Sequence, residues 1–245
     1  MQDTRYRGDV IDALAVLKIL RDRHSSLQCS LIDDLVREYS RKNPNWYELA
    51  LVWRSRHLAR PTAFDSIALT CVKRFIIIPL LLVSRNGADM HTNFVILDRN
   101  KKVIERFEPC GTTPSTYPDV RRLDRNLRLL ARMYWGDAAE LCSPRKSKGI
   151  GLQVQQEMEH RWRTSEYRTE SGLTGYCMVW AAMYAEHRIV HNLVGANHIP
   201  DIMLASIQGG GLTEHMENMA MEIQTVKASL MVGESQFKVD YIARV

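Results

Sequence analysis

The stretch HTNFVILDRNKKVIERFEPCG, residues 91–111, decides the fold of this chain because its pattern predicts a β-hairpin. Two short apolar runs rich in strand-forming residues lie at residues 94–97 and 103–107. Between them lies the polar turn segment DRNKK, residues 98–102. We therefore expect two antiparallel strands, with a histidine at the start of the first and a glutamate at the end of the second.

The register of this hairpin determines whether the histidine meets the glutamate. If Asp98 faces Lys101, the numbers of paired residues sum to 199, and His91 then faces Glu108. Directly opposed residues have Cβ atoms about 5 Å apart, so the ring of His91 can donate to the Glu108 carboxylate and be oriented by it. A shift of one residue would place the two side chains on opposite faces of the sheet.

A second informative segment is TGYCMVW, residues 174–180, which places a cysteine between a glycine-containing loop and an apolar run. We predict a mostly buried helix from Cys177 to about residue 190. Free N–H groups and the helix dipole at the first turn favour a thiolate over a thiol. The backbone N–H of Cys177 could also contribute to an oxyanion hole. A histidine, a carboxylate and a cysteine together are the parts of a thiol protease.

The composition is compatible with one large domain but does not discriminate between functions, since 45% of the 245 residues are hydrophobic and 25% are charged. Five scattered cysteines argue against a disulfide framework and for a reducing compartment, and we recognise no signal peptide. The longest apolar run, residues 75–83, is far shorter than the roughly 20 residues that span a bilayer. Its central Pro79 indicates an edge strand or a bulge.

The chain has a net charge of +5 and a pI near 9.0, and its basic residues cluster in two segments. These are RRLDRNLRLLAR at residues 121–132 and PRKSKG at residues 144–149. The pattern is typical of a solvated helix face followed by a loop. The alternative is a nucleic-acid contact, because clustered Lys and Arg bind phosphates without sequence preference. No zinc finger or phosphate-binding glycine loop accompanies the clusters.

The expected organisation is a single domain, residues 1–245, in three regions. Helices over 8–24, 30–41 and 45–57 would form a helical N-terminal region, 1–70. The core would comprise residues 71–195. It would contain strands at about 72–84, 91–98 and 102–108, followed by a helix over 119–134. A loop-rich segment over 139–175, with a short helix near 153–162, would then lead to the helix that starts at Cys177. Helices near 200–207 and 213–232 would form a helical C-terminal region, 196–245.

These motifs carry a resemblance to a known group of enzymes. FEPCG, with RFIIIPLLL before it and GIGLQ and GYCMVW after it, resembles the adenovirus maturation protease and the SUMO-type ubiquitin-like-protein proteases. The likeness is greatest to the form found in large nucleocytoplasmic DNA viruses, and it covers roughly residues 72–192. The resemblance implies an α+β, papain-like fold, in which a small, mostly antiparallel sheet packs against a central helix that carries the nucleophile.

The resemblance also implies roles for individual residues. Cys177 would be the nucleophile, His91 the general base, and Glu108 the carboxylate that orients His91. In these families a histidine begins one strand and an acidic residue ends the next, about as far along as here. The aromatic residue that commonly follows the histidine is replaced by Thr92.

A glutamine that helps to bind the oxyanion is a further feature of these families. In the adenovirus and SUMO enzymes it lies six or seven residues before the cysteine, where this chain has Ser171 and Glu170. The large-virus form carries its glutamine well upstream, so Gln153 in GIGLQ is the candidate. Gln155 and Gln156 lie close enough to be alternatives.

Other readings of the cysteines have less support. Cys110 is a rival nucleophile two residues from Glu108, but its Pro-Cys-Gly turn offers no helix start. A zinc site from Cys110, Cys142 and either His160 or His187 would lack any short ligand pair such as CxxC or HxxxH. We therefore expect neither a metal nor a cofactor.

The resemblance implies a cysteine endopeptidase that cleaves after small residues such as glycine. We favour maturation of viral capsid or core precursors over removal of ubiquitin-like modifiers from host proteins. A third hypothesis is a non-catalytic virion structural or DNA-binding protein with a protease-like fold. The expected partners are polypeptide substrates, and DNA through the basic segments, with no membrane contact. The expected location is the virion or the host cytoplasm.

Overall fold

The computed structural model describes residues 10–30, 50–85, 90–109, 119–143, 177–207 and 212–232. Within these ranges, seven strands form one mixed sheet in the order β3-β2-β4-β5-β6-β7, with β1 also beside β4. The strands are β1 (Gln28–Ser30), β2 (Leu51–Arg54), β3 (His57–Ala59), β4 (Phe75–Val83), β5 (Met90–Asp98), β6 (Val103–Arg106) and β7 (Glu140–Cys142). The helices are α1 (Val10–His24), α3 (Thr62–Thr70), α4 (Val120–Trp135), α6 (Cys177–Val190), α7 (Ile199–Ser206) and α8 (Leu212–Val232), with short 3-10 turns η2 (Gly136–Ala138) and η3 (Ala196–His198).

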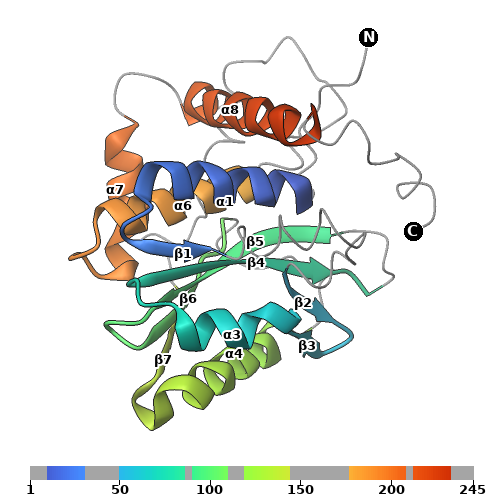
Figure 1. Cartoon of the computed structure of the whole chain (residues 1–245), viewed down its shortest axis with the longest axis vertical. Helices are drawn as coiled ribbons and strands as arrows, with labels where there is room; N and C mark the ends of the chain where they lie inside the picture. Colours follow the sequence, from blue (N-terminus) through green and yellow to red (C-terminus); the bar gives the residue numbers. More distant parts are fainter. Residues whose placement is uncertain are drawn as a thin grey trace.

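Helices cover both faces of this sheet (Figure 1). On one face lie α1, α6, α7 and α8, and on the other lie α3 and α4. The predicted α+β architecture is therefore confirmed, with a central helix that begins at Cys177 and packs on the sheet. The sheet is mixed rather than mostly antiparallel, because β1 and β2 pair with β4, and β7 with β6, in parallel.

Strand β4 lies in the middle of the sheet, so the expectation that Pro79 marks an edge strand is wrong. One side of β4 pairs along its whole length with β5. The other side pairs first with β1, over residues 75–77, and then with β2, over residues 80–82. Pro79 lies in the short interval where β4 changes its parallel partner. A residue that lacks an N–H is tolerated at such an interruption.

The first seventy residues contribute strands to this sheet, which corrects the prediction of a purely helical N-terminal region. The helix predicted over 45–57 is wrong in its described part, since β2 and β3 form a hairpin there. Its two-residue turn consists of Ser55 and Arg56, both with positive φ (49° and 66°). A tight hairpin turn needs this left-handed backbone, which Asn-Gly usually signals and Ser-Arg does not. The predicted helix over 30–41 lies outside the described residues.

The helices predicted near both ends of the chain are confirmed as α1, α7 and α8. A buried carboxylate joins two of them, because Asp12 on α1 accepts from Gln224 on α8 at 3.3 Å and pairs with Lys227 at 2.9 Å. At the other end of α1, Arg23 forms ion pairs with Glu186 and Glu222. Within the part of the chain that the structure describes, no helix has the length and apolar character needed to cross a bilayer.

The described cysteines differ in their bonding state. Cys71, at the end of α3, is disulfide-bonded. Cys142 and Cys177 are free thiols.

Candidate active site

His91 is positioned by the β5–β6 hairpin, but not in the predicted register. Val95 pairs with Arg106, so the numbers of paired residues sum to 201 rather than 199. Continued past the end of β6, this register places Glu108 opposite Asn93, and His91 becomes a diagonal neighbour of Glu108. Because side chains alternate between faces every residue, a shift of two leaves His91 and Glu108 on the same face.

The hairpin turn is two residues longer than predicted, and Asp98 explains the difference. Asp98 pairs with Val103, which leaves a four-residue turn over residues 99–102. The Asp98 carboxylate accepts from the backbone N–H of Lys101 at 3.2 Å, a side-chain interaction that stabilises such turns. The last turn residue, Lys102, takes a positive φ of 55°.

The ring of His91 contacts Glu108 directly. His91 Nε2 lies 3.2 Å from Glu108 Oε1, and the two residues are only 6% and 8% exposed. Asn93 lies beside both, with its Nδ2 3.3 Å from His91 Nε2 and 3.4 Å from Glu108 Oε2. The predicted proximity of His91 and Glu108 is therefore present, although the register that was used to predict it is wrong.

His91 also interacts with Cys177, and its pKa reflects both partners. Burial on its own lowers the pKa of this imidazole, but hydrogen bonds to Cys177 and Glu108 and the charges of both groups raise it to about 10. An imidazole with such a pKa is protonated at neutral pH. The positive charge of this ring then lies between a carboxylate and a sulfur.

Cys177 is the first residue of α6 and is 9% exposed. The apolar residues that follow it, from Met178 to Ala185, are all buried, so this end of the helix is held firmly against the core. Helix α6 packs on β5, the strand that carries His91. The sulfur thus lies at the N-terminal end of the helix, the positive end of its dipole.

A buried arginine lies behind Glu108. Arg106 Nη1 is 3.7 Å from Glu108 Oε2, and Arg106 Nε donates to Asp124 of α4 at 2.8 Å. Arg106 itself is 5% exposed. A second positive charge therefore lies beside the carboxylate that contacts His91.

A second buried charge network joins α6 to the hairpin about three turns beyond Cys177. Arg188 on α6 donates to Glu105 at 2.9 Å and to Asp98 at 2.8 Å. Tyr184 donates to Glu105 at 3.0 Å, and Arg74 pairs with Asp98 at 2.9 Å. Burial raises the pKa of Glu105, while the charge of Arg188 and its hydrogen bond oppose that rise. The network therefore links the element that carries Cys177 to the one that carries His91.

Some candidates from the sequence cannot be placed. Gln153, its neighbours Gln155 and Gln156, and Cys110 lie outside the described residues. The described residues contain no group of three His, Cys, Asp or Glu that could hold a metal ion. Cys142 contacts Asn197 Oδ1 at 3.5 Å instead.

Sequence reasoning missed Asn93, Arg106 and Arg188. The signal for Asn93 was its position two residues after His91, on the same face of the strand. Arg188 and Arg106 gave no comparable signal, since arginines are usually exposed. Each of these two is buried and pairs with a carboxylate from another element.

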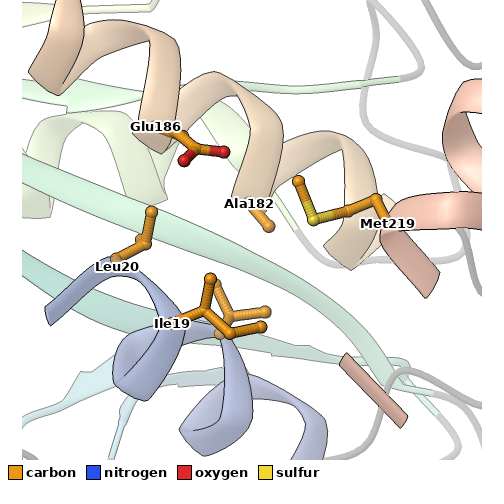
Figure 2. Close-up of a pocket in the computed structure, with 6 residues that line it drawn as sticks. Ile19, Leu20, Ala182, Glu186 and Met219 are labelled. Atoms are coloured by element: carbon orange, nitrogen blue, oxygen red, sulfur yellow. The ribbon is translucent and has the colours of Figure 1, made fainter. Parts of the chain in front are cut away.

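The hollow shown in Figure 2 lies elsewhere and does not contain the candidate site. It lies between α1, α6 and α8 and is lined mainly by apolar side chains such as Ile19, Leu20, Ala182 and Met219. Its one charged residue, Glu186, is paired with Arg23 and contacts His24. None of His91, Glu108 and Cys177 lines it.

Comparisons with known proteins give similarities at low identity. No family model matches the sequence. The chain is 23% identical over 213 residues to an Acanthamoeba polyphaga mimivirus protein described as an ankyrin repeat protein, a match that covers 75% of this chain and 26% of the relative. The chain therefore spans about a quarter of the length of that relative.

The structure is similar to two solved structures. One is a de-sumoylating protease, with a TM-score of 0.44 and 7% identity over 96% of this chain and 86% of that chain. The other is the Chlamydia abortus effector protein ChlaDUB, with a TM-score of 0.37 and 12% identity over 86% of this chain and 99% of that chain. Both TM-scores are below 0.5 and both identities are below 25%, so these similarities do not assign a function to this chain.

Proposed function

We propose that this chain is a cysteine peptidase in which Cys177 is the nucleophile, His91 the acid and base, and Glu108 the group that orients His91. The observation that carries the proposal is the buried His91 ring, which lies 3.2 Å from Glu108 and also interacts with Cys177 at the start of α6. A histidine buried between a carboxylate and a cysteine, with a strongly shifted pKa, is the kind of group that clusters at functional sites.

The arrangement is suited to acyl transfer. The Cys177 sulfur attacks the carbonyl carbon of a peptide or isopeptide, and His91 gives its proton to the leaving amine as the C–N bond breaks. Water then attacks the thioester and gives a proton to His91. The C–S bond breaks, the acid product leaves, and the thiolate and imidazolium are restored. The backbone N–H of Cys177, with Gln153 as the proposed side-chain donor, would stabilise the oxyanion.

The substrate follows from the motif resemblance rather than from the geometry. We propose cleavage after small residues such as glycine, in precursors of viral capsid or core proteins. The mimivirus relative belongs to a large DNA virus, which agrees with that setting. The alternative is hydrolysis of ubiquitin-like conjugates of host proteins.

The chain offers an internal comparison for testing the nucleophile. Burial and the nearby charge of Glu105 raise the pKa of the free thiol Cys142 to about 11, so this thiol should react slowly at neutral pH. We expect iodoacetamide or a peptide vinyl sulfone to label Cys177 well before Cys142. Mass spectrometry of tryptic peptides, in the wild type and in Cys177→Ala and Cys142→Ala, measures the two rates.

Labelling of both thiols at similar, ordinary rates would support a non-catalytic scaffold and refute the peptidase. To separate the two enzymatic uses, the protein is incubated with a SUMO–fluorophore conjugate and with candidate viral precursors that contain small-residue sites. Turnover of the conjugate alone would replace maturation by deconjugation.

A further inference from the structure

The two oxygens of the Glu108 carboxylate have different surroundings. Oε1 faces His91, at 3.2 Å from Nε2. Oε2 accepts from Asn93 Nδ2 at 3.4 Å and lies 3.7 Å from Arg106 Nη1. Oε2 thus accepts a hydrogen bond from Asn93 and forms an ion pair with Arg106, while Oε1 contacts the histidine.

We infer that Asn93 is a positioning residue for the proposed reaction, which anchors Glu108 Oε2 so that Oε1 faces the His91 ring. The inference depends on the proposed function, since it concerns the same site. The terminal torsion of a glutamate side chain is broad, so the carboxylate plane must be fixed by its partners. The donor from Asn93 on β5 and the guanidinium of Arg106 on β6 reach it from the two strands of one hairpin.

The register explains why Asn93 is placed for this task. Residues 91 and 93 lie on the same face of β5, and the hairpin register places residue 93 opposite residue 108. An asparagine at this position therefore reaches both members of the pair at once. Asn93 is also completely buried, so its side chain has no contact with solvent.

The carbonyl oxygen of the Asn93 amide differs from its nitrogen in having no partner among the described residues. Asn93 Oδ1 is buried and accepts no hydrogen bond from the residues that the structure describes. A buried acceptor without a donor costs stability, and an apolar residue of the same shape would avoid that cost. The hydrogen bond that Nδ2 donates to Glu108 is the gain that the asparagine offers in return.

Two substitutions of Asn93 test the role of its donor. Asn93→Leu keeps the branched shape at Cγ, although its methyl groups are larger, and removes the donor at every pH. Asn93→Asp keeps the shape but, when ionised, presents a second carboxylate to Glu108. We expect both variants to lower kcat by roughly tenfold to hundredfold with little change in KM, as is common when a group that orients a reacting residue is lost.

The pH profile separates positioning from simple destabilisation. In Asn93→Asp, activity relative to the wild type should recover as the pH falls, because a protonated carboxyl can again donate to Glu108. Asn93→Leu should show no such recovery. Val95→Ala is the matched control, since Val95 is fully buried on the same face of β5 and its truncation destabilises the strand without removing a donor.

The outcomes distinguish failure of the inference from failure of the proposed function. Selective, His91-dependent labelling of wild-type Cys177, together with unchanged kcat and pH profile in both Asn93 variants, would overturn the role of Asn93 alone. A loss of kcat in Val95→Ala equal to that in Asn93→Leu, without recovery in Asn93→Asp, would also overturn it. Absence of selective Cys177 labelling in the wild type would refute the peptidase itself.

Discussion

At the residue scale, the protein keeps a charge where burial alone would remove it. Desolvation lowers the pKa of His91, yet Cys177 and Glu108 together raise it to about 10. The balance depends on contacts that are lost if the chain unfolds. The protonated ring is therefore a property of the fold and links the proposed active site to stability.

Glu108→Gln should make this link measurable. Removing the carboxylate removes a contribution that raises the pKa of His91, so the alkaline limit of activity should move from near pH 10 to lower pH, with a strong loss of turnover. Rate profiles of Cys177 alkylation and of peptide hydrolysis against pH report the shift. An alkaline limit that stays in place would show that Glu108 does not set the charge of His91.

Glu108→Gln should also change how the free energy of unfolding depends on pH. A raised histidine pKa stabilises the folded state fully below the unfolded pKa, near 6.5, and this contribution is lost as the pH rises through about 10. The difference in unfolding free energy between wild type and Glu108→Gln should thus be largest below pH 6.5 and shrink toward pH 10. Urea denaturation across that range measures it.

The three proposed catalytic residues could be predicted from the sequence because each is tied to a local pattern. His91 and Glu108 bracket a hairpin, and Cys177 begins an apolar helix. Their proximity survived an error of two residues in register, since such an error preserves the face of a strand. Asn93 was missed because its position opposite Glu108 depends on the register, although its place on the same face as His91 follows from the two-residue spacing.

At the scale of elements, helix α6 is attached to the hairpin by ionic contacts as well as by apolar packing. Arg188 is fully buried and pairs with both Asp98 and Glu105. Because Cys177 is on the same helix, the network fixes the position of α6 along β5 and β6. The position of the sulfur relative to His91 depends on it.

Arg188→Met should therefore destabilise the fold by about 3–5 kcal/mol, as is usual when one partner of a buried ion pair is removed and the other remains. Urea denaturation measures the change, and Arg128→Met on α4, an exposed arginine, is the matched control that should stay within about 0.5 kcal/mol. Equal effects of the two substitutions would show that the buried network does not stabilise the docking of α6.

The elements that sequence reasoning misassigned lack a local signal. Residues 50–53 are apolar and continuous, a pattern that fits a buried strand and a buried helix equally well. The turn at Ser55 and Arg56 carries no residue that favours a positive φ. Only the pairing of β2 with β4, about thirty residues later in the chain, decides the structure there.

At the scale of the whole molecule, the net positive charge is not evenly spread. Helix α4 lies on the outer side of the sheet, away from α1, α6 and α8 (Figure 1). It buries one apolar face, formed by Leu123, Leu127, Leu130 and Ala131. Its exposed face carries Arg121, Arg125, Arg128 and Arg132, spaced so that they form a single stripe along the helix.

The stripe does not follow from the needs of the helix. The first turn of α4 contains no acidic residue, although the helix dipole favours acidic residues there and disfavours arginines such as Arg121 and Arg122. Among the ion pairs of the described residues, this face has only the contact of Arg132 with Asp137, at 4.0 Å. Two interpretations from the sequence remain, a solvated face and a surface that binds nucleic-acid phosphates.

If the stripe binds phosphates, affinity for DNA should be independent of sequence and fall steeply with salt. The triple variant Arg121→Gln, Arg125→Gln, Arg128→Gln should then reduce the slope of log K against log salt by about 3, roughly one for each lost phosphate contact. Fluorescence anisotropy with a labelled duplex measures this slope. The matched control replaces Arg56, Arg85 and Lys102, three exposed cations elsewhere, with Gln and so removes the same net charge. Equal loss in both triples would mean that only net charge matters, and the solvated face would be the correct interpretation.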